Sequence, residues 1–344
     1  MSNTFGDRLR ITTWGESHGP AVGAVIDGCP AGLAISVAEL EAELARDVPD
    51  PAIGTPRREP NRVEILSGVF AGRTLGSPVS LLIRNEDVCS DGYFVREQLP
   101  RPGHADLSWR QRYGHVDPRG GGRASGRECI ARLAAGVVAK KLLLGAGVSI
   151  GSRVTELAGI AIETEDDRER AHEEVRRVGK AGDSTGGTVS VTAEGLPPGI
   201  GAPVFGKLTA RVGQALLSIG GVKGVEFGEG FSHARLRGSE SNDPIVGLEN
   251  GDVRPATNRA GGTLGGISTG LPLRVVLAVK PTPSVRREQD TVDLGTGEPA
   301  RVSGKGRFDM NFAPRVAVIA ESMLAFVVAD ALLESGHIHP TRVS

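Results

Sequence analysis

One long apolar segment limits the possible folds of this chain more than any other feature. The stretch "RVAVIAESMLAFVVADALL" (315–333) would be apolar around almost its whole circumference if it formed a helix. Such a helix must be covered on several sides, so we expect it in the middle of a domain. No run of about 18 apolar residues occurs, so we expect no membrane-spanning segment.

The remaining segments indicate what covers that helix. Helices are predicted at 36–46, 125–144, 165–178 and 203–219, and strand-like runs fall at 9–14, 21–28, 63–72, 78–85, 148–162 and 187–196. The strands do not alternate regularly with helices, as a doubly wound parallel sheet would require. We therefore predict one α+β domain (1–344), with antiparallel sheets covering central helices and a mobile loop at 285–306.

Helix-start signals support these boundaries. Ser36 with Glu39, and Ser125 with Glu128, have the spacing of capping boxes. Pro203 would stand near the start of the fourth helix. The charged run at 165–178 predicts a solvated helix face.

Bulk properties exclude several classes of protein. The net charge is −1 and aromatic residues make up 4%, so neither nucleic acid nor an anionic membrane is an expected partner. Cys29, Cys89 and Cys129 form neither a zinc pattern nor a disulfide framework. The N-terminus lacks the apolar stretch of a signal peptide, so we expect a cytoplasmic protein.

The loop "RGGGRASGRE" (119–128) is the clearest candidate binding feature. It leads onto a predicted helix start, where free N–H groups and the helix dipole favour an anion. Arg119, Arg123 and Arg127 surround this point, and Arg suits forked contact with phosphate or carboxylate. A plain turn with solvated arginines explains the same residues.

Two histidines and two further loops add possible chemistry. His18 in "WGESHGP" and His104 in "RPGHAD" lie in open turns, where each is a candidate general acid or an incidental residue. The loop after "LRVVLAV" offers Lys280, Thr282 and Ser284 to a phosphate, or it is simply a turn. "GKGRFD" brings Lys305, Arg307 and Asp309 together, as an ion pair or around a base. His337 and His339 lack a third ligand nearby, so no metal site is predicted.

Taken together, these motifs resemble the chorismate synthase family. "TTWGESHG", "RPGHAD", "RGGGRASGRE", "GGTLGGISTG", "KPTPS" and "GRFD" occur in the family's order and at its spacing, over nearly the whole chain. The resemblance implies a β-α-β sandwich, a homotetramer and bound reduced FMN. It also implies the loss of phosphate and a ring proton from 5-enolpyruvylshikimate 3-phosphate, giving chorismate. Whether such a chain reduces its own flavin with NADPH stays open.

The resemblance also implies roles for particular residues. His18, with Ser17 beside it, would protonate the departing phosphate; His104 would stabilise the reduced flavin, and Asp309 would help take the C6 proton. Arg46, Arg119 and Arg127 would bind the anionic substrate. The expected FMN contacts are Arg123, Ala124, Ser125, Gly265, Lys280, Pro281, Thr282, Pro283, Ser284 and Arg307.

The chain departs from the family pattern on the substrate side. Asp47 and Val48 stand within the family's arginine run, Cys89 and Val116 replace arginines, and Phe308 replaces a histidine. Gly220-Gly221 replaces a Pro-Ala or Asn-Ala pair. A hydrogen bond to a charged group contributes about 1.5–3 kcal/mol, so losing three arginines would cost several powers of ten in affinity. Three hypotheses therefore stay open: the chain is a chorismate synthase, a paralogue with a less anionic substrate, or a non-catalytic flavin-binding protein.

Overall fold

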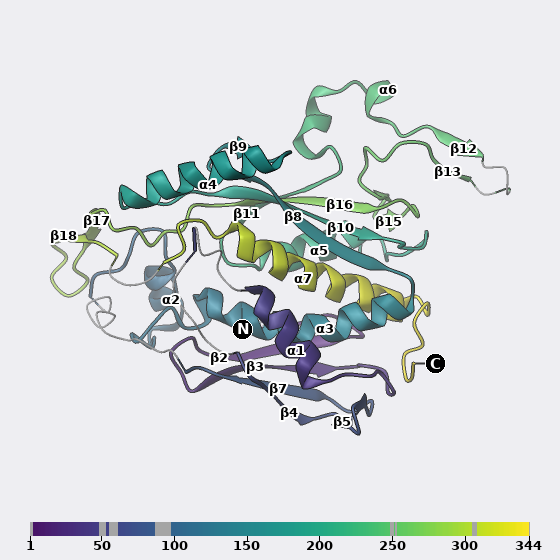
Figure 1. The fold of residues 1–344 in the computed structure, drawn as a ribbon, viewed down its shortest axis with the longest axis horizontal. Helices are drawn as coiled ribbons and strands as arrows, with labels where there is room; N and C mark the ends of the chain where they lie inside the picture. The colour runs from purple at the N-terminus through teal and green to yellow at the C-terminus, as the bar shows by residue number, and fades with distance from the viewer. Residues whose placement is uncertain are drawn as a thin grey trace.

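Two five-stranded antiparallel sheets enclose a layer of helices (Figure 1). The computed structural model describes residues 3–47, 53–54, 61–86, 98–247, 251, 253–304 and 308–343. This arrangement confirms the predicted α+β sandwich, in which antiparallel sheets cover central helices.

The first sheet is built from the early strands in the order β1-β2-β3-β7-β4. Its strands are β1 (Thr4–Phe5), β2 (Arg10–Gly15), β3 (Ala21–Asp27), β4 (Val63–Ser67) and β7 (Val79–Arg84). Val79, Leu81 and Ile83 alternate along β7 and are completely buried, so one face of the sheet packs on the helices. A small hairpin of β5 (Val69–Phe70) and β6 (Arg73–Thr74) lies beside it.

The second sheet has the order β11-β16-β10-β8-β9. Its strands are β8 (Ser149–Leu157), β9 (Ile160–Ala161), β10 (Gly187–Glu194), β11 (Val222–Phe227) and β16 (Leu273–Val279). Val189, Val191 and Ala193 on β10 are buried, which gives this sheet its inner face. Helix α4 (Glu165–Lys180) packs against β8 and β9, and only Ala171 and Val175 of it are buried, as its charged sequence predicted.

Helices α3 (Cys129–Gly145) and α7 (Ala313–Glu334) pack against each other between the sheets. A Cβ at Gly136 would lie 2.4 Å from the Cβ of Ser322, so glycine allows the two helices to approach closely. By length and composition α7 could cross a membrane, but 94% of its apolar window is buried inside the fold, as expected for a core helix. Helices α1 (Val37–Leu44) and α5 (Leu208–Leu217) complete the layer.

The charged residues of α7 have partners that join distant parts of the chain. Asp330 is completely buried and accepts hydrogen bonds from the backbone N–H groups of Asp7, Arg8 and Leu9 at 2.7–2.9 Å. It also pairs with Arg211 of α5. The end of α7 therefore fixes the segment that enters the first sheet.

The other elements lie at the ends of the sandwich. They are α2 (Asp106–Tyr113), α6 (Gly238–Ser241), and the two-stranded pairs β12 (Ile245–Gly247) with β13 (Val253–Pro255), β14 (Thr263–Leu264) with β15 (Ile267–Ser268), and β17 (Gln289–Val292) with β18 (Pro299–Val302). Short 3-10 turns span Ala45–Asp47, Gly122–Ala124, Gly126–Glu128 and Gly230–Arg235. The β17–β18 hairpin occupies most of the 285–306 segment, whose mobility stays a prediction.

Of three predicted helix starts, the structure confirms one and differs from two. Ser36 and Glu39 form the predicted capping box. The Ser125–Glu128 box is wrong: Ser125 caps Arg127, whereas the Glu128 carboxylate accepts a 2.7 Å hydrogen bond from Thr13. The start at Pro203 is also wrong, because the carbonyl of Gly206 accepts a hydrogen bond from Ala202 in a turn and α5 begins only at Leu208.

Candidate functional site

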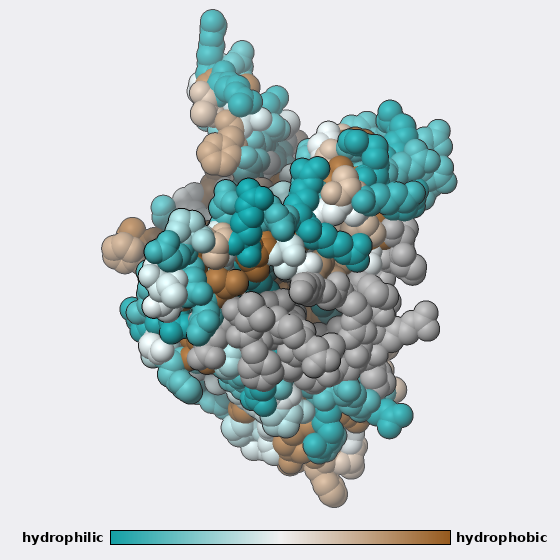
Figure 2. All heavy atoms as spheres, turned by 90° about the vertical axis from the view of Figure 1, so that its left-hand side faces the viewer, coloured by the Kyte–Doolittle hydropathy of each residue, from teal (hydrophilic) through white to brown (hydrophobic). Residues whose placement is uncertain are grey.

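The first turns of α3 and α7 meet at one end of the molecule (Figure 1). Phe312, the residue before α7, lies between the turn that leads into α3 and the segment that leads into β11. A Cβ at Gly126 would be 3.1 Å from its ring, and a Cβ at Gly221 would be 3.6 Å away. Two helix N-termini in one place favour a bound anion. Figure 2 looks onto this end, where the described surface is largely hydrophilic around a small apolar area.

His18 lies against the glycine-rich loop. A Cβ at Gly120 would be 2.4 Å from Cδ2 of the His18 ring, so only glycine leaves room for the imidazole. Ser17 beside it is 2% exposed, and its Oγ has no hydrogen-bond partner among the described residues. Arg119 chiefly, and His18 to a smaller extent, lower the pKa of Asp117, which places that carboxylate near the imidazole.

His104 is held by the loop that follows β16. Its Nδ1 lies 3.0 Å from the carbonyl oxygen of Pro102, and its Nε2 lies 2.8 Å from Oγ of Ser284. Since a carbonyl only accepts, Nδ1 carries a proton, and in the neutral ring Nε2 accepts from the serine hydroxyl. These two contacts fix the orientation of the histidine ring.

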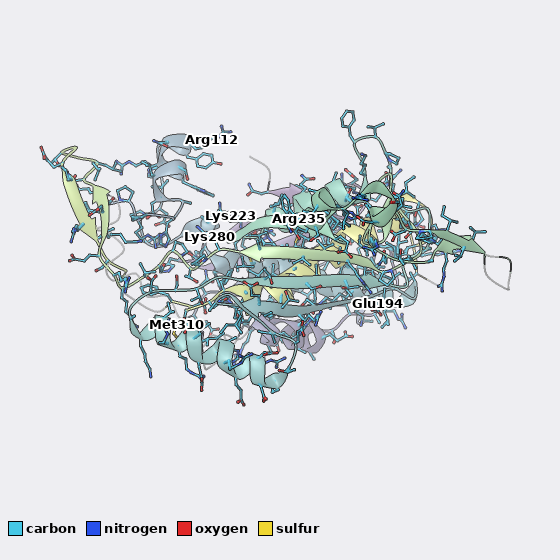
Figure 3. All side chains as sticks on the ribbon, turned by 90° about the horizontal axis from the view of Figure 1, so that it is seen from above. Arg112, Glu194, Lys223, Arg235, Lys280 and Met310 are labelled. Atoms are coloured by element: carbon cyan, nitrogen blue, oxygen red, sulfur yellow. The ribbon has the colours of Figure 1, made fainter. Side chains whose placement is uncertain are left out.

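The same loop supplies a cation and an unpaired hydroxyl. Lys280 Nζ donates to the carbonyl oxygen of Gly103 at 2.8 Å. Burial, and to a smaller extent the charge of Lys223, lower the pKa of Lys280. The Oγ1 atom of Thr282 is buried with no partner among the described residues. Figure 3 shows Lys280 and Lys223 close together, at the end of the sheet opposite Glu194.

Asp309 lies in a buried group of charges before α7. Its Oδ2 accepts a 3.2 Å hydrogen bond from Nη1 of Arg315. The same guanidinium binds both carboxylate oxygens of Asp47 at 2.8 Å each and lies over the ring of Phe312. Burial lowers the pKa of Arg315, but the two carboxylates outweigh it and raise the pKa above its ordinary value.

A short loop after α4 connects these groups. Ser184 Oγ donates to the carbonyl of Thr282 at 2.6 Å, and the N–H of Thr185 donates to the carbonyl of Met310 at 3.0 Å. Asn311 Nδ2 donates to Thr185 Oγ1 at 3.0 Å. Together with Phe312, these contacts join the surroundings of His18, His104 and Asp309 at one end of the fold.

The residues expected to contact FMN are not all brought together. Loop 280–284 lies at this end, and Ala124 and Ser125 form the turn before α3. Arg123 points back to β2, where it binds the carbonyls of Gly15 and Thr13 at 3.1 and 3.0 Å. Arg307 lies outside the described residues.

Gly265 stands apart from the other expected flavin contacts. It lies in the β14–β15 turn, and a Cβ at nearby Gly262 would be 2.7 Å from Leu273 at the start of β16. Lys280 follows the other end of that seven-residue strand, about 20 Å away at 3.3 Å per residue. One chain alone therefore does not place Gly265 beside loop 280–284.

The three expected substrate arginines each have protein partners. Arg119 pairs with Asp117 at 2.7 Å. Arg127 is 7% exposed and donates to side chains or carbonyls of Asn61, Arg84 and Asn85.

Arg46 lies away from the histidines. It contacts Glu321 at 2.7 Å, and Glu321 stands eight residues into α7, about 12 Å along the helix from its start. A role for Arg46 in substrate binding stays a prediction, as it does for Arg119 and Arg127.

The departures from the family pattern fall in different surroundings. Asp47 is buried against Arg315, and Gly221 has a φ of +91°, which favours glycine there. Val116 and Phe308 are half-buried. Val48 and Cys89 lie outside the described residues.

Sequence reasoning missed Arg315 and the partner of Asp47. One signal could have found them: Arg315 is the one cation of a largely apolar helix, and a buried cation requires a carboxylate. The partner itself lies 268 positions away, so spacing could not identify it.

The site fits an anionic cofactor better than a metal ion. The orphaned hydroxyls of Ser17 and Thr282, the cation of Lys280 and the two helix N-termini all suit a phosphorylated group. Among the described residues, no group of three or more His, Cys, Asp or Glu side chains could hold a metal.

Comparison with known proteins identifies the family of this chain. The family model described as "Chorismate synthase" matches residues 9–333. Chorismate synthase of Methanococcoides burtonii is 48% identical over 361 residues, covering 99% of this chain and 98% of the relative. That of Methanosarcina acetivorans is 48% identical over 358 residues, covering 98% of each. A crystal structure of chorismate synthase superposes with a TM-score of 0.77 at 34% identity, covering 96% of this chain and 93% of that one. This protein belongs to the chorismate synthase family.

Proposed function

We propose that this protein is an FMN-dependent lyase of the shikimate pathway, which eliminates phosphate from 5-enolpyruvylshikimate 3-phosphate to give chorismate. One observation carries this proposal beyond family membership. Contacts between neighbouring residues link the three distant segments that carry His18, His104 and Asp309 near the N-termini of α3 and α7, which supports their convergence on one site. A leaving phosphate needs an acid and fixed positive dipoles, and this end of the fold offers both.

Each side chain has a separate task in the proposed reaction. His18 donates a proton to the phosphate as its bond to the ring breaks, and Asp309 receives the ring proton. Loop 280–284, with Lys280 and Thr282, would hold the flavin, and His104 would stand beside it. Reduced FMN, when bound, supplies the electron density that assists phosphate loss without a net redox change.

We also propose that the active form is a homotetramer. Val204, Phe205 and Phe231 are 72%, 94% and 74% exposed, and apolar side chains of that exposure favour an interface. A neighbouring copy could bring Gly265 to loop 280–284, which one chain does not do. Light scattering of the purified protein tests this: a monomer that turns over at full rate would contradict it.

Anaerobic turnover with reduced FMN and 5-enolpyruvylshikimate 3-phosphate tests the reaction. The native protein should form chorismate, and His18→Ala should lower kcat by about 100-fold or more, as expected for loss of a general acid. His337→Ala, in the exposed C-terminal segment, is the matched control and should leave kcat unchanged. Absence of chorismate from native protein that binds reduced FMN would refute the proposed substrate.

A second candidate function has its own support. Arg46, Arg119 and Arg127 already have protein partners, and Arg315 is paired with Asp47, so these four arginines offer less charge to a substrate. This charge pattern favours a related elimination from a less anionic cyclohexene-type substrate. Such a paralogue would bind reduced FMN and eliminate phosphate only from analogues that lack one of the substrate's carboxylates.

A further inference from the structure

A single amide side chain spans the turn that carries His18. The N–H of Gly19 donates to the carbonyl of Glu16 at 3.0 Å and closes this turn, so Ser17 and His18 are its central residues. Nδ2 of Asn85 donates to the same Glu16 carbonyl at 3.0 Å and to the carbonyl of Gly19 at 2.8 Å. Both ends of the turn are therefore bound to one side chain.

The first sheet fixes the backbone of Asn85. This residue directly follows β7, and its N–H donates to the carbonyl of Pro20 at 3.1 Å, which extends the pairing of β3 with β7 by one residue. Alternate residues of β7 are completely buried against the helix layer. Because a well-packed strand is a rigid support, the amide reaches the turn from a fixed point.

Arg127 fixes the orientation of the amide. Its Nε donates to Oδ1 of Asn85 at 2.9 Å, and its Nη2 donates to the carbonyl of Arg84 at 3.1 Å. A guanidinium only donates and a carbonyl only accepts, so Oδ1 must face Arg127 and Nδ2 must face the turn. Arg127 is buried in the 3-10 turn before α3, and the His18 turn is thereby tied to the start of that helix.

A second arginine of the glycine-rich loop binds the chain just before the turn. Nη1 of Arg123 donates to the carbonyl of Gly15 at 3.1 Å. Gly15 has a φ of +87°, and a Cβ there would lie 2.2 Å from the carbonyl oxygen of Ala21, so only glycine allows the chain to bend here. The loop thus holds the approach to the turn directly, and it holds the turn itself through Asn85.

We propose that Asn85 is a positioning residue that holds His18 in place for proton transfer to the departing phosphate. A general acid must lie within hydrogen-bond reach of the atom it protonates, and a displacement of about 1 Å costs up to about 100-fold in rate. The two bonds from Nδ2 fix the backbone on both sides of His18, so their loss lets the imidazole move. This inference rests on the proposed function, in which His18 is that acid.

Asn85→Asp separates the two sides of the amide. The carboxylate still accepts from Arg127, more strongly because it is charged, but it has no proton to donate to the turn. We expect Asn85→Asp and Asn85→Ala both to lower kcat by about 10- to 100-fold, with KM and the Kd of reduced FMN within about threefold. A native kcat in Asn85→Asp would mean that only the bond to Arg127 matters and would overturn the proposal, as would a raised KM alone.

The double variant of Asn85→Ala with His18→Ala tests whether Asn85 acts through the imidazole. Once the imidazole is removed, a residue that only positions it has no further effect on the rate. The double variant should therefore be no slower than His18→Ala alone. A further loss of kcat in the double variant would give Asn85 a separate role and overturn the proposal.

Ser67→Ala is the matched control at the other end of β7. Ser67 Oγ donates to the carbonyl of Pro78, the residue before that strand, at 2.9 Å. Its loss removes a bond from a side chain to a carbonyl in the same sheet, away from the turn, and should leave kcat within about twofold. A fall in kcat as large as that of Asn85→Ala would assign the effect to the sheet as a whole and overturn the proposal.

Hydrogen exchange of the Gly19 amide provides a test that needs no turnover. This N–H closes the turn, so it should exchange about 10-fold faster in both Asn85 variants than in the native protein, while the amides of α3 keep their native rates. Unchanged exchange at Gly19, or equal acceleration throughout α3, would overturn the hold of Asn85 on the turn. If the native protein forms no chorismate but Gly19 alone exchanges faster, the proposed substrate fails while that hold stands.

Discussion

Replacing Gly120 by alanine should disable His18 while leaving the fold intact. The new Cβ would lie 2.4, 2.7 and 2.9 Å from Cδ2, Cγ and Nε2 of the His18 ring. Carbon atoms in contact prefer about 3.5–4.0 Å, so the ring must move by about 1 Å. Such a displacement of a catalytic group costs about 100-fold in rate, or about 2.7 kcal/mol of the activation barrier.

The effect on stability should be much smaller. The φ of Gly120 is not positive, so alanine introduces no backbone strain, and the half-buried ring can swing aside. We expect the free energy of unfolding to fall by about 1 kcal/mol, at the low end for overpacking. Anaerobic turnover gives kcat, and urea unfolding gives the stability of the same preparation.

Gly213→Ala is the matched control, because a Cβ there would meet nothing within 4 Å. It lies inside α5 and should stabilise the protein by up to about 1 kcal/mol without changing kcat. The double variant Gly120→Ala with His18→Ala should be no slower than His18→Ala alone. A native kcat in Gly120→Ala, or multiplicative losses in the double variant, would refute the reasoning.

Three further predictions concern buried or half-buried groups. Asp330→Asn should lower the free energy of unfolding by about 3–5 kcal/mol in urea, because it weakens a buried charge pair. Burial raises the pKa of Asp106, but the hydrogen bonds and charge of Arg101 outweigh it and the pKa is lowered. A lowered folded-state pKa gives stability that is present above the unfolded value of about 3.9 and lost as pH falls through the folded value, so Asp106→Asn should flatten the acid limb of unfolding. Burial raises the pKa of Cys29 and Cys129 to about 11 and about 12, so neither should be alkylated in native protein at pH 8, as peptide mapping can check.

Each of these three predictions has a result that would contradict it. A native midpoint for Asp330→Asn would mean that the N-terminal segment is held by other contacts. If Asp106→Asn leaves the acid limb of the unfolding curve unchanged, the pairing of Asp106 with Arg101 does not differ between the folded and unfolded states. Alkylation of Cys29 or Cys129 before unfolding would mean that the core around that cysteine opens in the native state.

The architecture was largely predictable from the sequence, because the periodicity of apolar residues indicates which faces of an element are buried. Residues 315–333 are apolar around almost the whole helix circumference, and α7 is indeed a buried helix of the middle layer. The strands closed by Gly, Pro or Asp became the two sheets. Local helix signals were less secure: Glu128 has the spacing of a cap, but a buried carboxylate gains more from Thr13 and Arg132 than from its own backbone.

The site was only partly predictable, because its contacts join residues far apart in the chain. His104 meets Ser284 across 180 positions, and Asp47 meets Arg315 across 268. The family resemblance implied that His104 and Ser284 both lie beside the flavin, but it did not predict their contact. Nothing in the spacing of Asp47 and Arg315 indicated that Asp47, a departure from the family pattern, points inward to α7.

The place of α7 also determines when the protein can fold as it is synthesised. Every strand of both five-stranded sheets precedes Ala313 in the chain, yet both need the layer that α7 completes. The Asp330 carboxylate that fixes residues 7–9 is made after all of these strands. A nascent chain on the ribosome must therefore carry two unfinished apolar faces until α7 emerges, which delays the folding of both sheets and exposes the chain to aggregation until then.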